Sequence, residues 1–110
     1  TVLLGSDEKL HQLNRDFRSK DEPTNVLSFP AAANTSDYRG DIALAYGITR
    51  RQAREAGKPF ADHAAHLVVH GVLHLAGHDH QRTRDARVME ALEVRILADL
   101  GIADPYRAPA

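Results

Sequence analysis

The sequence predicts a small α/β (α+β) layer structure. Short apolar segments typical of strands occur early in the chain, and two long segments with helical periodicity occur late. The composition agrees with this class, because 43% of the 110 residues are hydrophobic and 26% are charged, as in a globular domain with an ordinary core. We therefore expect residues 1–110 to form a single domain.

The first part of the chain is expected to contain two strands and one helix. Residues 2–4 are the first strand, and Ser6 or Asp7 can cap the helix that follows. The apolar face of this helix is predicted from its periodic residues, which are Leu10, Leu13, Asn14 and Phe17. Pro23 excludes helix from the polar connection over 18–23, and residues 25–29 are the second strand, which we expect to end at Pro30.

The remaining elements are one strand and three helices. After a small polar loop, residues 41–46 are the third strand, and 49–56 are a helix that ends at Gly57. Residues 61–76 are the longest helix candidate, with Gly77 as its stop, and 85–100 are a second long one that ends at Gly101. The apolar stripe of this last helix is predicted to comprise Val88, Met89, Leu92, Ile96 and Leu100.

Composition also limits the functional classes. The chain has no cysteine, so disulfides are excluded, nitrogen and oxygen must supply any metal ligands, and a cytoplasmic location is compatible. No apolar run is long enough to cross a membrane, so we expect no membrane partner. The net charge of −1 gives no global attraction to nucleic acid, which leaves only local basic patches for that purpose.

The segment HGVLHLAGHDH, residues 70–80, holds four of the seven histidines. His70 and His74 are four residues apart, so they project from one helical face and can converge on one ion. Gly77 can adopt the left-handed conformation that turns the chain back, which would let His80 reach the same ion. We therefore predict a metal site at the end of a long helix, with His70, His74 and His80 as ligands and a fourth position left for water or substrate.

The spacing is similar to the metzincin pattern HExxHxxGxxH, with one difference. The metzincin glutamate, which acts as general base, is replaced by Gly71. This HxxxHxxGxxH cradle without its glutamate favours chemistry other than peptide hydrolysis. Of the other histidines, His11 and His63 are expected to be ordinary, whereas His66 and His78, expected not to be ligands, could lie beside the metal or in a substrate groove.

The same residues resemble a known family. HGVLHLAGHDH is similar to the signature of the YbeY family of rRNA maturation factors, in which three histidines bind metal. The resemblance extends to LNRDFRSKDEPTNVLSFP, GDIALAY and MEALEVRILADLG, and so covers nearly the whole chain. It implies a small mixed β-sheet packed against several helices. Because family members usually carry another helix and strand before the segment that begins at Thr1, we expect the chain to lack these elements.

The resemblance also implies an activity. It implies a zinc-dependent endoribonuclease with one Zn²⁺ per chain that acts in 16S rRNA 3′-end maturation and late ribosome quality control, with the small ribosomal subunit and assembly factors as partners. It singles out Arg18, whose guanidinium could bind the scissile phosphate bidentately, although pairing with Asp16 or Asp21 is the alternative. We expect the metal to polarise a phosphodiester oxygen and to lower the pKa of bound water, so that no glutamate base is needed.

The expected substrate is single-stranded RNA. Basic residues are concentrated before the metal motif, and they are Arg15, Arg18, Lys20, Arg39, Arg50, Arg51 and Arg54. Solvated helix charges explain this clustering equally well. Two alternative functions remain at this point: a metal-dependent hydrolase of peptides or small amides, with Asp41 or Glu90 as base, and a zinc-stabilised assembly factor that binds the ribosome.

Overall fold

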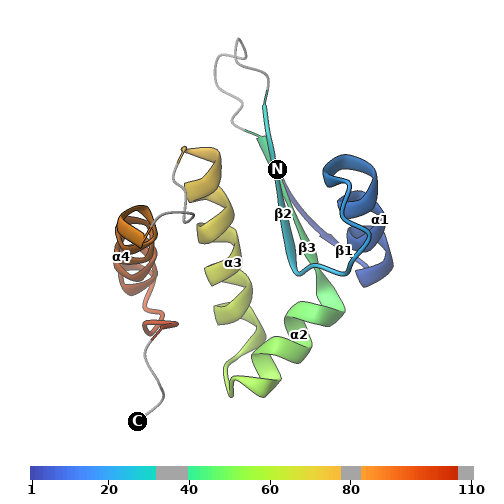
Figure 1. Cartoon of the computed structure of the whole chain (residues 1–110). Coiled ribbons are helices and arrows are strands. Elements are labelled where there is room, and N and C mark those ends of the chain that lie inside the picture. The colour runs from blue at the N-terminus through green and yellow to red at the C-terminus, as the bar shows by residue number, and fades with distance from the viewer. Residues whose placement is uncertain (32–39, 78–82, 107–110) are drawn as a thin grey trace.

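The computed structural model describes residues 1–31, 40–77 and 83–106. Three strands and four helices follow one another in these ranges (Figure 1). Their bounds are β1 Val2–Gly5, α1 Asp7–Arg18, β2 Val26–Pro30, β3 Gly40–Ala45, α2 Tyr46–Glu55, α3 Phe60–Leu75 and α4 Thr83–Asp99. No helix in the described part of the chain is long and apolar enough to span a membrane.

The three strands form one mixed sheet in the order β1-β3-β2, which confirms the expected architecture. β1 runs parallel to β3, with Leu3 opposite Ala43, and β2 runs antiparallel to β3, with Leu27 opposite the same residue. β2 covers 26–30 rather than the predicted 25–29, so Pro30 is its last residue. An edge strand tolerates proline because one side of its backbone needs no hydrogen-bonding partner within the sheet.

Helices cover both faces of the sheet. α1 lies on one face and α3 on the other, while α4 packs on the outer side of α3 (Figure 1). β3 is therefore buried on both sides, and its residues Ile42, Ala43, Leu44 and Ala45 are at most 3% exposed. This central strand holds the two layers of helices together.

The hydrophobic core consists of two clusters. The first joins the sheet to α1 and α2, and its buried members are Leu10, Leu27, Ala43, Ala45 and Ile48. The second joins α3 to α4, and its buried members are Val69, Leu73, Met89 and Leu97. The sheet therefore has one core cluster with α1 and α2, and α3 shares the other cluster with α4.

Several predictions about the helices need correction. α2 begins at Tyr46 rather than 49, because β3 runs directly into it and the Asp7 carboxylate of α1 accepts the Ile48 backbone N–H. α4 covers 83–99 rather than 85–100. Some predicted core positions face solvent, because the cores are narrower than the apolar stripes: the exposed ones are Phe17, Val88 and Leu100.

Candidate metal centre

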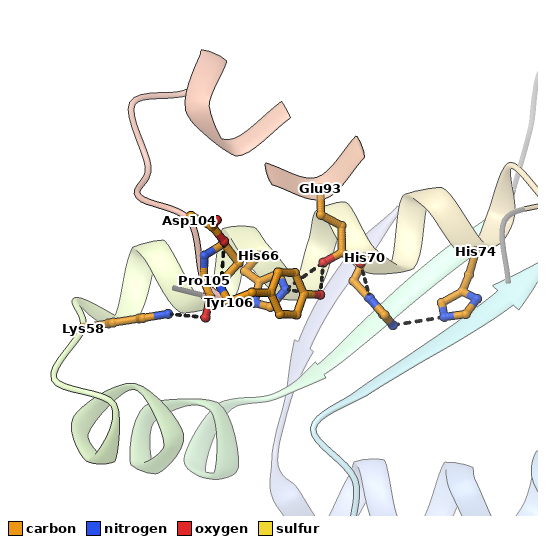
Figure 2. Close-up of polar contacts among 8 residues, drawn as sticks. All are labelled: Lys58, His66, His70, His74, Glu93, Asp104, Pro105 and Tyr106. Carbon is orange, nitrogen blue, oxygen red and sulfur yellow. Dashed lines mark hydrogen bonds and ion pairs between the residues drawn. The ribbon is translucent and has the colours of Figure 1, made fainter. Parts of the chain in front are cut away.

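His70 and His74 lie in the last two turns of α3, and their rings converge. The two Nε2 atoms are 3.0 Å apart, and the ring centroids are 4.6 Å apart (Figure 2). Two ligands of a tetrahedral zinc, each at about 2.0–2.1 Å, lie about 3.3 Å from each other. Neutral imidazole nitrogens are also ligands that zinc prefers. The pair therefore fits two corners of a zinc site.

The third expected ligand, His80, lies outside the described residues, as does His78. Within the described ranges, no group of three His, Cys, Asp or Glu side chains is arranged to hold a metal ion. Gly77, which follows α3, has a φ of +98°, the left-handed conformation expected where the helix stops. The ligand set of His70, His74 and His80 stays a prediction.

The buried carboxylate of Glu93 contacts His70 on the side of the ring that is opposite His74. Oε1 of Glu93, from α4, lies 2.6 Å from His70 Nδ1, and the Glu93 side chain has no exposed surface. Its other oxygen, Oε2, lies 2.9 Å from His66 Nε2 and accepts a short hydrogen bond from the Tyr106 hydroxyl (Figure 2). The ring nitrogen of His70 that faces away from His74 is therefore held by a charged partner.

The ionisation of Glu93 reflects these partners. Burial opposes ionisation and by itself raises the pKa of this carboxyl. Hydrogen bonds from His66, His70 and Tyr106 outweigh that effect and lower the pKa of Glu93 to about 2. Burial and the bond to Glu93 in turn raise the pKa of the Tyr106 hydroxyl. At neutral pH the group facing His70 is a carboxylate.

Gly71 is explained by packing. A Cβ at this position would lie 3.0 Å from both Ile42 Cδ1 and Ser28 Oγ, because α3 presses against the sheet there. A glutamate at residue 71 would point its charge into this contact. Residue 71, which corresponds to the glutamate base of the metzincin pattern, therefore lies in the interface between α3 and the sheet.

Arg18, at the end of α1, is exposed. The alternative partners suggested by the sequence are engaged elsewhere, because Asp16 binds Arg15 at 3.3 Å and Asp21 binds His11 at 2.7 Å. Within the described residues Arg18 makes no ion pair, so its guanidinium is available to an anion. The structure does not bring it into contact with the histidine pair.

Two residues of this network were missed by the sequence analysis, namely Glu93 and Tyr106. A signal for the first exists in the sequence: Glu93 lies midway between Met89 and Leu97, which are both fully buried, so an acid stands on the core face of α4. Tyr106 has no comparable signal. His66, expected not to be a ligand, binds Glu93 instead.

Glu90 and Asp41, the alternative bases, lie in different places. Glu90 lines a cavity of about 200 Å³ beside His70, together with Ala86, Met89, Glu93 and Tyr106. Asp41 lines a separate groove next to β1 and lies 3.4 Å from the N-terminal amine. Among the cavities lined by residues 1–31, 40–77 and 83–106, the one beside His70 includes Glu90.

Comparison with known proteins identifies relatives across the whole fold. The family model described as "Endoribonuclease YbeY" matches residues 1–101. Proteins described as "Endoribonuclease YbeY" match from Maricaulis maris (52% identity, 96% of this chain, 66% of the relative) and Methylocella silvestris (51%, 99% and 63%). Another from Alkalilimnicola ehrlichii is 56% identical over 87% of this chain and 61% of its own length.

A solved structure also has a fold similar to that of this chain. The solution structure of TM1509 from Thermotoga maritima superposes with a TM-score of 0.57 at 29% identity, covering 96% of this chain and 76% of that one. The chain spans 61–66% of the length of the three relatives described above. A family match over residues 1–101 and about 50% identity to these relatives show that the chain belongs to the YbeY family.

Proposed function

We propose that residues 1–110 form a zinc-dependent endoribonuclease domain that cleaves single-stranded RNA. The observation that carries the proposal is the 3.0 Å approach of His70 Nε2 and His74 Nε2, in a chain of the YbeY family. Such a pair suits a divalent cation, and the carboxylate behind His70 is the kind of partner that orients metal-binding histidines.

His70, His74 and His80 would hold one Zn²⁺. When bound, the ion would supply Lewis-acid charge to a phosphodiester oxygen and lower the pKa of water. Glu93 would keep His70 oriented, and Gly71 would let α3 pack closely against the sheet. The substrate is RNA because the relatives are described as endoribonucleases.

Arg18 would bind the scissile phosphate through its guanidinium. The ends of α1 and α3 lie at the same end of the sheet, which supports this role. Phe17, next to Arg18, packs on Phe29 of β2 with ring centroids 5.8 Å apart. At the following pair of the ladder Pro30 faces Gly40, and a Cβ on Gly40 would lie 3.0 Å from Leu75 Cδ2 at the end of α3. These contacts link the neighbour of Arg18 to the sheet edge beside Leu75 of α3, which supports an anion-binding role for Arg18.

The cellular role that we propose is 16S rRNA 3′-end maturation and late ribosome quality control in the cytoplasm. The partners would be the 16S rRNA precursor, the small ribosomal subunit and its assembly factors. Family membership supports this role. We expect no membrane partner.

The test is metal content followed by RNA cleavage on the same samples. Wild type should carry about one zinc per chain and cleave a labelled single-stranded RNA, and His74→Ala should lose both. His11→Ala is the matched control, since His11 lies on α1 and pairs with Asp21. Metal retained in His74→Ala would overturn the ligand assignment. Wild type that binds zinc but cleaves no RNA would favour an assembly factor, and cleavage of a labelled peptide instead would favour the peptide hydrolase.

A further inference from the structure

The Glu93 carboxylate has three hydrogen-bond partners among the described residues, namely His66, His70 and Tyr106. His70 approaches Oε1, and His66 approaches Oε2, both from successive turns of α3. Tyr106 approaches Oε2 from the segment after α4 (Figure 2). A carboxylate with no exposed surface and three partners has little freedom to rotate.

The carboxylate dictates where its partners carry protons. A carboxylate accepts hydrogen bonds, so the 2.6 Å approach of His70 Nδ1 to Oε1 and the 2.9 Å approach of His66 Nε2 to Oε2 point to a proton on each of these two nitrogens. A neutral His70 with a proton on Nδ1 has an unprotonated Nε2, which is the atom 3.0 Å from His74 Nε2. Glu93 thus selects the tautomer of His70 that presents a lone pair toward the candidate metal centre.

Tyr106 is itself held in place by the chain around it. Its backbone N–H donates to Asp104 Oδ1 at 2.8 Å, and the neighbouring Pro105 carbonyl accepts from Lys58 Nζ at 3.4 Å. Its ring meets the ring of His66 edge-on at 5.5 Å between centroids. The segment 102–106 is therefore attached both to its own turn and to the chain just before α3.

The sharing of oxygens gives Tyr106 a specific role. Tyr106 and His66 both bind Oε2, which leaves Oε1 of Glu93 to His70. A carboxylate held at one oxygen has its other oxygen fixed in direction. Tyr106 therefore acts on His70 through Glu93, although the two side chains belong to segments 36 positions apart in the sequence.

We propose that Glu93 and Tyr106 are positioning residues of the metal centre, and that the segment after α4 is part of that centre. Tyr106 anchors the Glu93 carboxylate, and Glu93 holds His70 as the Nδ1–H tautomer with Nε2 directed to the metal. This inference rests on the proposed function, because it concerns the same histidine pair. According to this inference, residues of α4 and of the segment after it hold His70 in place beside His74.

The experiment measures two properties that do not depend on RNA cleavage. Long-range ¹H–¹⁵N correlation spectra of the metal-free protein identify the tautomer of His70, and competition with a chromophoric chelator gives the zinc affinity. The variants are Glu93→Gln and Tyr106→Phe, with Tyr46→Phe as control. Tyr46 matches Tyr106 in exposure, at 45% against 47%, and packs on Phe60 away from the network.

In wild type we expect His70 to be the Nδ1–H tautomer. Glu93→Gln should mix the two tautomers and lower the zinc affinity by about 10- to 100-fold, the usual cost of losing such a partner. Tyr106→Phe should move both readouts in the same direction, with a loss of about tenfold. Tyr46→Phe should leave both unchanged.

Folded Glu93→Gln and Tyr106→Phe proteins with the wild-type tautomer and affinity would overturn the inference, whatever happens to cleavage. If Glu93→Gln fails to fold, Tyr106→Phe decides alone, because it removes only a hydroxyl from a half-exposed residue. Failure of the proposed function looks different: wild type would bind zinc with the expected tautomer but leave RNA intact.

Discussion

The carboxylate of Asp7, at the start of α1, accepts a hydrogen bond of 2.9 Å from the backbone N–H of Ile48 in the first turn of α2. α2 has no side-chain cap of its own, because Ala45 occupies its N-cap position. Gly47 leaves room for this contact, since a Cβ there would lie 2.4 Å from Asp7 Oδ2. One helix thus caps another across 41 positions of sequence.

Asp7→Ala should therefore destabilise the protein by about 1 kcal/mol, the usual cost of a lost N-cap. Asp7→Asn keeps an acceptor and should lose less. Urea unfolding of both variants measures the difference, with Glu8→Ala as the control, since Glu8 is the neighbouring exposed carboxylate of α1. Equal losses for Asp7→Ala and Glu8→Ala would contradict the capping role.

Gly71→Ala should be destabilising in spite of the higher helix propensity of alanine. The added methyl lies 3.0 Å from Ile42 Cδ1, and such overpacking costs about 1–3 kcal/mol, against about 1 kcal/mol gained from propensity. Ile42→Val removes the opposing methyl, so the double variant should lose less than the sum of the two single losses. Strictly additive losses would show that the two positions do not touch.

His63 should make the protein less stable in mild acid. Burial, followed by the charges of His66 and Lys58, lowers the pKa of this imidazole below its ordinary 6.5, while its ring lies 3.0 Å from Gln52 Oε1. The folded state therefore resists protonation, and its stability falls as the pH drops below 6.5. In His63→Gln the fall should be shallower, as measured by urea unfolding of the metal-free proteins across this range. Parallel curves would rule out a contribution from His63.

Arg18→Ala should lower RNA cleavage by about 100-fold, the order of magnitude for removing one group that stabilises developing charge. The zinc affinity and the unfolding free energy should not change, because Arg18 is exposed and has no ion-pair partner in the described ranges. Lys9→Ala removes an exposed charge from the same helix and should cleave like wild type. Cleavage rates at saturating RNA separate these variants, and an equal loss in both would reduce Arg18 to a general electrostatic contribution.

The sequence was sufficient for features that depend on neighbours along the chain. The cap of α1 is an example, since Ser6, one of the two predicted candidates, accepts from the Lys9 backbone N–H at 3.1 Å, three residues away. The stop at Gly77 is another, because a glycine can take the positive φ that ends α3. The convergence of His70 and His74 also follows from their spacing on one helix.

Features that depend on contacts between elements could not be predicted in this way. α2 begins three residues early because Asp7 comes from another helix. The partner of His70 is a glutamate 23 positions away, on the core face of α4. Phe17 fits the helical periodicity of α1 and still is 70% exposed, since only part of that face meets the sheet. Periodicity indicates which residues share a helical face, but it does not indicate which other elements pack against that face.

The position of α3 between the two core clusters links ligand binding to cooperativity. One side of the helix meets the sheet at Gly71, and the other meets α4 through Val69 and Leu73. A ligand that binds only the folded form at 100 times its dissociation constant adds about 2.7 kcal/mol to stability. Because Glu93 connects α4 to His70, zinc should slow amide hydrogen exchange in α4 as well as in α3. With the ion bound, the two core clusters would then unfold together as one cooperative unit.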